Sequence, residues 1–406
     1  MSASVLAQLT LGYRCLWNGR RLPVAVELHV DAAAARGVDA RHLLSTLTEL
    51  WPARAPRPLL SVRQPALLHD LLLHADAESP VITVPQAALD NHTLRLRVQQ
   101  AGQRGLPMFW QGGPGQLPPD ELASCFQRHM VRLSDAQALQ ALQTLRTQAH
   151  GTSSGPQTGN PPLQGQVLVA PGQPALVDWA LDKLDAWAVA GWPMEQMRVP
   201  LRQQPATVSR EAIDLLLRDI ERDASLDRIE EEFMAEPVLA YRLLAHLNAT
   251  ALRPHSPLDS IQRGLMLWGL GPVQNWLRTQ RAQAGDAVNL RPVRQQVVTR
   301  AQLLVQLLEP GDEEELRREL WLCGLLSQLD LLLGEPLPVV LERLPLSQRI
   351  LQSLLEQGGP YQSGLELARR LESPDTQATR RFCEERGYAA EDVNRALLHT
   401  LASLGS

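Results

Sequence analysis

EPVLAYRLLAHLN, at residues 236–248, is the stretch that decides the fold of the second half of this chain. Its leucines, from Leu239 to Leu247, recur every third or fourth position, which is the spacing of one face of an α-helix. Pro237 stands at the start, in the first helical turn, where proline is favoured. The stretch therefore predicts a helix that packs through one leucine-rich face.

The sequence on either side of this stretch continues the helical pattern. Ser209 and Ser225 are placed to cap helices whose apolar residues repeat with helical spacing. Asp312 with Glu315 fits a capping box ahead of a long apolar helix. Strand patterns are missing from this half, so the sequence predicts an all-helical domain at residues 206–406.

The first half of the chain alternates short apolar runs with helical stretches. The predicted strands are bounded by Pro, Gly or polar residues, and they lie at residues 12–17, 23–29, 59–62, 81–84, 107–110, 129–133 and 166–169. The predicted helices lie at 40–50, 66–74, 136–148 and 175–190. This order is typical of an α/β domain with a mainly parallel sheet, which we assign to residues 1–205.

A segment rich in Gly, Ser, Thr and Pro interrupts this α/β domain. It reads HGTSSGPQTGNPPLQ at residues 150–164, and Leu163 is its one large apolar residue. Because it offers so little to bury, we expect a flexible loop at residues 150–165. The strand and the helix predicted after it belong to the same domain, so the domain boundary is expected at residues 199–207.

The composition limits the classes of protein to which the chain belongs. Its 406 residues suit two domains, and the formal net charge of −5 argues against an electrostatic nucleic-acid binder. The four cysteines are widely scattered, which disfavours a metal knuckle or a disulfide framework. The sequence has neither a signal peptide nor a long apolar run. We expect a cytoplasmic protein that binds neither membrane nor nucleic acid.

Three stretches of the helical half resemble the HDOD family, whose domain is related to HD-type phosphohydrolases but lacks their metal centre. Residues 236–248 resemble its D-P-x-L-x-x-x-L-L-x-x-x-N helix. DSIQRGLMLWGLGPVQNWL, at 259–277, resembles its S-I-x-x-A-L-x-x-L-G-x-x-x-L-x-x-W-L segment, with Gly264 in place of the usual Ala. Residues 322–371 resemble the GLFSLLD … PL … LPLS tail found where HDOD follows an EAL-type domain.

The first half is similar to EAL phosphodiesterases in the position and order of its elements. YRCLWNGRRLPVAVEL, at residues 13–28, resembles the opening hairpin of that family. The resemblance places Glu27 where the family has its first metal-binding glutamate. The next residues, Leu28 to Val30, lack the arginine with which active relatives bind cyclic di-GMP.

The later ligand positions of that family carry no carboxylate in this sequence. LLSVR at 59–63 stands in place of V-N-L-S, VITV at 81–84 in place of E-I-T-E, and PMFWQ at 107–111 in place of A-L-D-D-F-G. Val, Phe and Trp cannot coordinate the oxygen-preferring cations that this hydrolysis needs. We therefore interpret Glu27 as a solvated or salt-bridged residue at the surface. Because a full eight-stranded barrel usually takes about 250 residues, we expect a reduced or distorted EAL-type barrel.

Neither half carries a convincing set of metal ligands. The helical half lacks a His-Asp doublet of the HD type. Its histidines are His246, His255 and His399. In the first half His69 and Asp70 form a doublet with His74 at helical spacing, and a solvated helix face is favoured over a metal pair. Phosphate-loop, dinucleotide and nucleophile-elbow motifs are missing, so the sequence predicts no catalytic, cofactor-binding or metal-binding residue.

These observations predict a bacterial signalling protein that acts through protein–protein contact, with both domains lacking catalytic ligands. The alternative is a receptor that binds cyclic di-GMP in the EAL-like domain without hydrolysing it, which the missing arginine weakens. Trp and Arg are frequent anchors of interfaces, so the predicted interaction surface is Trp276, Arg278 and Arg281. Core packing is the other interpretation of the tryptophan. The expected partner is a protein, no cofactor is expected, and no particular oligomeric state is predicted.

Overall fold

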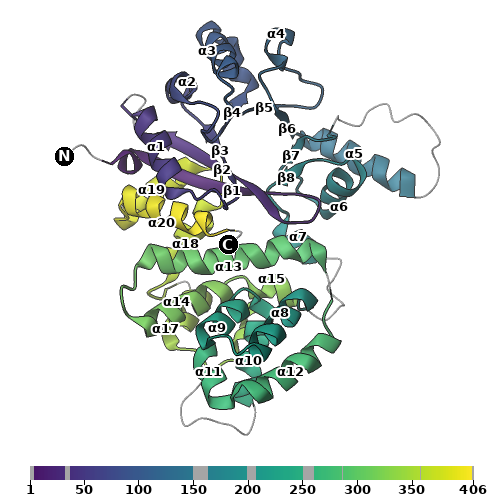
Figure 1. Cartoon of the computed structure of the whole chain (residues 1–406), viewed down its shortest axis with the longest axis vertical. Helices are drawn as coiled ribbons and strands as arrows, with labels where there is room; N and C mark the ends of the chain where they lie inside the picture. Colours follow the sequence, from purple (N-terminus) through teal and green to yellow (C-terminus); the bar gives the residue numbers. More distant parts are fainter. Residues whose placement is uncertain are drawn as a thin grey trace. The chain divides into compact units, whose positions relative to one another are not determined.

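The computed structural model describes residues 4–32, 37–149, 163–198, 207–249, 260–285, 287–356 and 358–404. The chain divides into two compact units (Figure 1): a barrel unit, Met1–Pro193 with Arg369–Ser406, and a helical unit, Met194–Ala368. Most of the expected loop and of the expected domain boundary, residues 150–162 and 199–206, lies outside the described residues.

Eight strands of the barrel unit form a closed barrel in chain order (Figure 1). The strands are β1 (Leu9–Trp17), β2 (Pro23–Ala32), β3 (Arg57–Val62), β4 (Val81–Pro85), β5 (Met108–Gly112), β6 (Arg128–Arg132), β7 (Val167–Val169) and β8 (Ala188–Ala190). β1 is antiparallel to both β2 and β8, and all the other neighbouring pairs are parallel. The predicted α/β barrel is confirmed. Its ring of strands is complete, although β7 and β8 have 3 residues each.

The strand that closes the barrel lies inside a segment predicted as a helix. Instead of one helix over residues 175–190, the chain forms α6 (Pro174–Asp178), a π-helical turn (Trp179–Lys183) and then β8. Ala188 and Ala190 are buried in the barrel interior, where β8 pairs with both β1 and β7. Alanine favours helices in isolation, but small side chains fit the interior where a small barrel closes. Tertiary packing therefore overrides the local preference.

Helices flank the strands around the barrel (Figure 1). They are η1 (Val5–Gln8), α1 (Ala40–Leu50), α2 (Pro65–His74), η2 (Gln86–Asp90), α3 (His92–Gln103), α4 (Asp120–Ala123), α5 (Asp135–Ala149) and α6. Local signals start two of them, because the Asp39 side chain caps α1 and Pro65 occupies the first turn of α2. α4 has 4 residues and α6 has 5, so the reduction of this barrel lies largely in its helices.

The last two helices of the chain belong to the barrel unit. α19 (Thr376–Arg386) packs against β1 and β2, and α20 (Ala390–Ala402) packs against η1 and β1. The chain leaves the barrel unit after Pro193 and returns to it at Arg369. This division differs from the predicted one, which assigned all of residues 206–406 to the helical domain. The difference arises because α19 and α20 are held by contacts with strands far away in the sequence, and such contacts leave no local signal.

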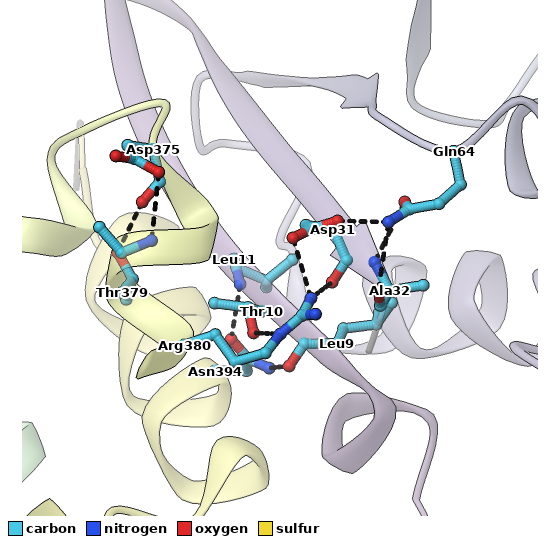
Figure 2. Close-up of polar contacts among 11 residues, drawn as sticks. Leu9, Thr10, Leu11, Asp31, Ala32, Gln64, Asp375, Thr379, Arg380 and Asn394 are labelled. Carbon is cyan, nitrogen blue, oxygen red and sulfur yellow. Dashed lines mark hydrogen bonds and ion pairs between the residues drawn. The ribbon is translucent and has the colours of Figure 1, made fainter. Parts of the chain in front are cut away.

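Asn394 joins α20 to the start of the barrel (Figure 2). Its side chain is 1% exposed, and its amide nitrogen donates to the carbonyl oxygens of Leu6 and Leu9, both at 2.9 Å. Its amide oxygen accepts the Leu11 N–H at 3.1 Å. Asn394 thus satisfies three buried backbone groups around the beginning of β1, and buried backbone groups without partners are costly.

Arg380 makes the corresponding connection from α19 (Figure 2). Its guanidinium donates to the Asp31 carboxylate at 2.9 Å, to the Asp31 carbonyl at 3.0 Å and to the Thr10 hydroxyl at 3.1 Å. Asp31 is 2% exposed, so this is a buried charge with a dedicated partner. Gly12 of β1 lies so close to the Ser373 carbonyl that a Cβ atom would collide with it. The C-terminal helices are therefore an integral part of the barrel unit.

The described part of the helical unit contains helices and no strand, which confirms the all-helical prediction. Its helices are α7 (Met194–Arg198), α8 (Arg210–Glu221), α9 (Leu226–Met234), α10 (Pro237–Ala249), α11 (Ile261–Trp268), α12 (Leu270–Ala282), η5 (Val288–Leu290), α13 (Arg291–Leu308), α14 (Glu314–Leu326), α15 (Leu329–Leu333), α16 (Leu337–Leu341), α17 (Gln348–Leu355) and α18 (Gln362–Leu371), which leads back to the barrel unit. Among the helices of the described residues, none is long and apolar enough to cross a membrane.

The predicted helix starts are confirmed in three cases and wrong in one. α10 begins at Pro237 as expected. Ser209 and Ser225 accept hydrogen bonds from backbone N–H groups in the first turns of α8 and α9. The expected capping box of Asp312 and Glu315 does not form, because α14 begins at Glu314 without a side-chain cap. Asp312 and Glu315 have the spacing of a capping box, but Asp312 lies one residue before the N-cap residue, Glu313.

Candidate functional site

Five polar side chains gather at the carboxyl end of the parallel strands β2, β3 and β4. We call them the polar layer, which consists of Arg14, Glu27, His29, Ser61 and Thr83. The residue two positions before Glu27, Ser61 or Thr83 belongs in each case to the apolar core of the barrel. Because side chains alternate along a strand, these three face the barrel interior directly after that core. Active sites of such barrels lie at this end.

Glu27 is the centre of the polar layer and is 1% exposed. Arg14, its partner across the β1–β2 pair, donates from Nε to Oε2 at 3.0 Å. The Ser61 hydroxyl donates to Oε1 at 2.6 Å and lies 2.7 Å from the Thr83 hydroxyl. The Thr83 hydroxyl donates in turn to the Leu60 carbonyl at 3.1 Å. Both carboxylate oxygens of Glu27 are therefore engaged by the protein itself.

The surroundings of Glu27 keep its carboxyl group ionised. Burial alone would raise its pKa, but the charge of Arg14, the neighbouring His29 and the Ser61 hydrogen bond together hold the pKa below its usual value. The prediction of a surface position was wrong, because β2 turns this residue inward. The prediction of a salt bridge is confirmed by the pair with Arg14.

His29 lies beside Glu27 with its side chain 12% exposed. Its Nδ1 is 3.8 Å from Oε1 of Glu27, and its buried Nε2 has no hydrogen-bond partner among the described residues. Burial lowers the pKa of the imidazole, Glu27 opposes this effect, and Arg14 and Arg132 reinforce it. The imidazole is therefore expected to be neutral at pH 7.

The positions on β4 and β5 that the sequence resemblance aligned with carboxylates carry apolar side chains in the interior. Val81 and Phe109 belong to the barrel core, and the Phe109 ring meets Trp187 edge-on with centroids 5.8 Å apart. Trp110 is buried and donates from its indole nitrogen to the Gln116 carbonyl at 3.4 Å. The polar layer thus offers one carboxylate, two hydroxyls, an imidazole and a guanidinium. A divalent cation needs several free oxygen ligands, and this set does not fit one.

The His-Asp doublet of α2 is partnered by neighbouring helices. His69 Nδ1 lies 3.0 Å from Asp70 Oδ1, and His69 Nε2 accepts from Arg97 at 3.0 Å. His74 accepts from Arg41 Nε at 3.2 Å, so it is tied to α1. Within the described ranges no three His, Cys, Asp or Glu residues are grouped to hold a metal ion.

The three predicted interface residues of α12 have different surroundings. The Trp276 side chain is 8% exposed and lies in an aromatic cluster with His246 and Trp268, at centroid distances of 6.0 and 6.5 Å. Arg278 and Arg281 are exposed by 54% and 47%. Trp276 is thus a core residue, and the two arginines remain candidates for a surface contact.

Sequence reasoning missed four members of the polar layer. In the sequence Arg14 stands out only as part of a hairpin, and His29, Ser61 and Thr83 only as members of stretches compared with a family pattern. The signal that would have found them is strand register, because Arg14 pairs directly with Glu27 and His29 pairs with Ser61. Register can be assigned only when the partner strands are known. A single strand shows only which of its own side chains share a face.

The two lowered pKa values predict a stability that falls on acidification. For His29 the stabilising neutral form is present above its ordinary pKa of 6.5 and is lost as the pH falls below it. For Glu27 the stabilising ionised form is present above its ordinary pKa of 4.5 and is lost as the pH falls through its lower folded value.

We expect the melting temperature to decrease from pH 7 to pH 4, measured by circular dichroism. In His29→Gln the decrease between pH 7 and 5 should shrink; a wild-type protein that melts higher at pH 5 than at pH 7 would contradict this.

Comparison with known proteins finds similarity over part of the chain. No family model matches it. The chain is 25% identical over 171 residues to the cyclic di-GMP phosphodiesterase CdgJ of Vibrio cholerae, covering 42% of this chain and 40% of that protein. It is 24% identical over 168 residues to the uncharacterized protein YuxH of Bacillus subtilis, covering 39% of each. The chain thus matches about two fifths of the length of these curated relatives, to which it is distantly related.

One solved structure is also similar. The MmoQ response regulator of Methylococcus capsulatus superposes with a TM-score of 0.40 at 18% sequence identity. The match covers 48% of this chain and 99% of that one.

Proposed function

We propose that this chain is a non-catalytic signal-transduction protein that acts through contact with other proteins. The distant relation to a cyclic di-GMP phosphodiesterase supports a place in signalling. One observation supports the absence of catalysis: Arg14 and Ser61 already donate hydrogen bonds to the Glu27 carboxylate. A carboxylate that already holds a guanidinium and a hydroxyl has no free oxygen pair for a catalytic cation.

The neighbouring strands support the same proposal. Hydrolysis of a phosphodiester by two cations requires several carboxylates converging on one place. Here the positions next to Glu27 are filled by Ser61 and Thr83, and those beyond them by Phe109 and the rest of the apolar core. Metal binding would require Arg14 to leave a buried carboxylate, which is costly.

An activity assay tests the catalytic half of this proposal. Purified full-length protein is incubated with cyclic di-GMP and Mg²⁺ or Mn²⁺, with CdgJ as the positive control, and the linear product is measured by chromatography. We expect no hydrolysis above the protein-free control. Turnover that disappears in Glu27→Gln would overturn the assignment, because it would show that Glu27 holds a cation after all.

The second candidate function is a receptor that binds cyclic di-GMP without cleaving it. Arg14 is already paired with Glu27, but Arg132, which lies close enough to affect the His29 pKa, is a positive charge that favours an anionic ligand at this end of the barrel. Isothermal titration of the full-length protein with cyclic di-GMP separates the two. Saturable binding that is lost in Arg132→Glu would establish the receptor, and absence of heat would support the protein-contact proposal.

A further inference from the structure

An open depression of about 910 Å³ lies between α8 and α12 of the helical unit. We call it the α8–α12 groove. Its walls carry four arginines, Arg210, Arg218, Arg278 and Arg281, together with Glu211, Asp214 and Leu217. The chain as a whole has a formal net charge of −5. This groove therefore differs in sign from the average surface and would attract an anionic group.

The ion pairs in the groove show which charges are already neutralised. Arg281 holds Asp214 through Nε at 2.5 Å, and Arg278 lies 3.8 Å from Glu221 at the end of α8. The remaining lining acid, Glu211, is 3.5 Å from Arg291, which does not line the groove. Each acidic side chain around the groove thus has a partner other than Arg210 and Arg218.

Arg210 and Arg218 bind backbone oxygens instead. Arg210 donates to the Ala284 carbonyl at 3.3 Å, and Arg218 donates to the Asp214 carbonyl at 3.2 Å. A carbonyl fixes the direction of a guanidinium without cancelling its charge. Among the residues that the structure describes, neither arginine forms an ion pair with a carboxylate. Two oriented positive charges therefore remain in the groove.

The surroundings of Asp214 show that the groove stabilises an ionised carboxylate. The Arg281 hydrogen bond and charge, with Arg210 and Arg218 nearby, lower the pKa of the Asp214 carboxyl group. One carboxylate is thus stabilised by three guanidiniums from both walls. The half-buried Leu217 adds an apolar contact between them. A charged segment with carboxylates and an apolar residue matches this lining.

We propose that the α8–α12 groove binds an acidic segment of a partner protein, whose carboxylates pair with Arg210 and Arg218 and whose apolar side chain contacts Leu217. This inference rests on the proposed function and names the chemistry of the partner. It also shifts the interaction surface from Trp276 and the two arginines of α12 toward α8. Arg278 and Arg281 then serve mainly to position α12 against α8.

The test uses two labelled helical peptides, one rich in Glu and Leu and one with every Glu replaced by Gln. Binding to the full-length protein is measured by fluorescence anisotropy. We expect saturable binding of the Glu peptide that weakens with added salt, and no binding of the Gln peptide. In Arg218→Glu the affinity should fall by about tenfold or more, because an attraction between opposite charges becomes a repulsion.

Arg317→Glu is the matched control, since Arg317 is also an exposed helical arginine that donates to a backbone carbonyl, that of Gly311 at 2.7 Å. Its affinity should equal that of the wild type. If Arg218→Glu lowers the melting temperature, Arg210→Glu replaces it. Equal affinities for the two peptides, an unchanged affinity in both groove variants, or tighter binding of a short DNA duplex to the groove would each overturn the proposal. The hydrolysis assay tests the proposed function separately, so either can fail alone.

Discussion

Replacing Glu27 with alanine is expected to destabilise the barrel unit by about 3 to 5 kcal/mol. The substitution leaves the Arg14 guanidinium, whose side chain is 10% exposed, in the barrel without its carboxylate. It also removes the acceptor of the Ser61 hydroxyl. The measurement is urea denaturation of the full-length protein followed by tryptophan fluorescence, to which the buried Trp17 of β1 contributes.

The double variant Arg14→Met/Glu27→Leu is the control for this result. Apolar residues of similar size often replace a buried ion pair with little loss or even with a gain of stability. We therefore expect the double variant to recover most of the stability that Glu27→Ala loses. A Glu27→Ala protein with the wild-type unfolding midpoint would instead show that the carboxylate is solvated, against its position in the structure.

Asn394→Leu is expected to lower the stability of the barrel unit by at least about 2 kcal/mol. The leucine has a similar size but removes the partners of the Leu9 carbonyl and of the Leu11 N–H. The Leu6 carbonyl loses one of two donors, because it also accepts the Leu9 N–H. Each buried backbone group left without a partner costs about 1 to 3 kcal/mol. The expected decrease in melting temperature is about 4 to 8 °C, measured by differential scanning calorimetry.

His399→Ala provides the control on the same helix. His399 is exposed on α20, and substitutions at exposed positions usually change stability by less than about 0.5 kcal/mol. The melting temperature of this variant should remain within 2 °C of the wild type, as roughly expected from that figure. If Asn394→Leu and His399→Ala have the same melting temperature, α20 contributes little to the stability of the barrel unit. The assignment of the last helices to this unit would then be wrong.

The elements that the sequence predicted well are those with strong local signals. The helix at α10 follows from leucines at helical spacing, and α8 and α9 from their serine caps. Seven of the eight strands overlap predicted ones, because short apolar runs bounded by Pro, Gly or polar residues mark them. The exception is β8, whose alanines carry a helical preference locally.

The sequence by itself determined the two fold classes and the absence of carboxylates from residues 59–63, 81–84 and 107–111, since both are properties of residue type and short-range order. The tertiary structure decided how those residues are used. Arg14 reaches Glu27 across an antiparallel pair, and Asn394 reaches the start of β1 from the far end of the chain. Contacts between residues hundreds of positions apart produce neither a hydrophobic periodicity nor a capping residue that could be recognised in the sequence. They arise when the strands close into a barrel, which fixes which side chains share its interior.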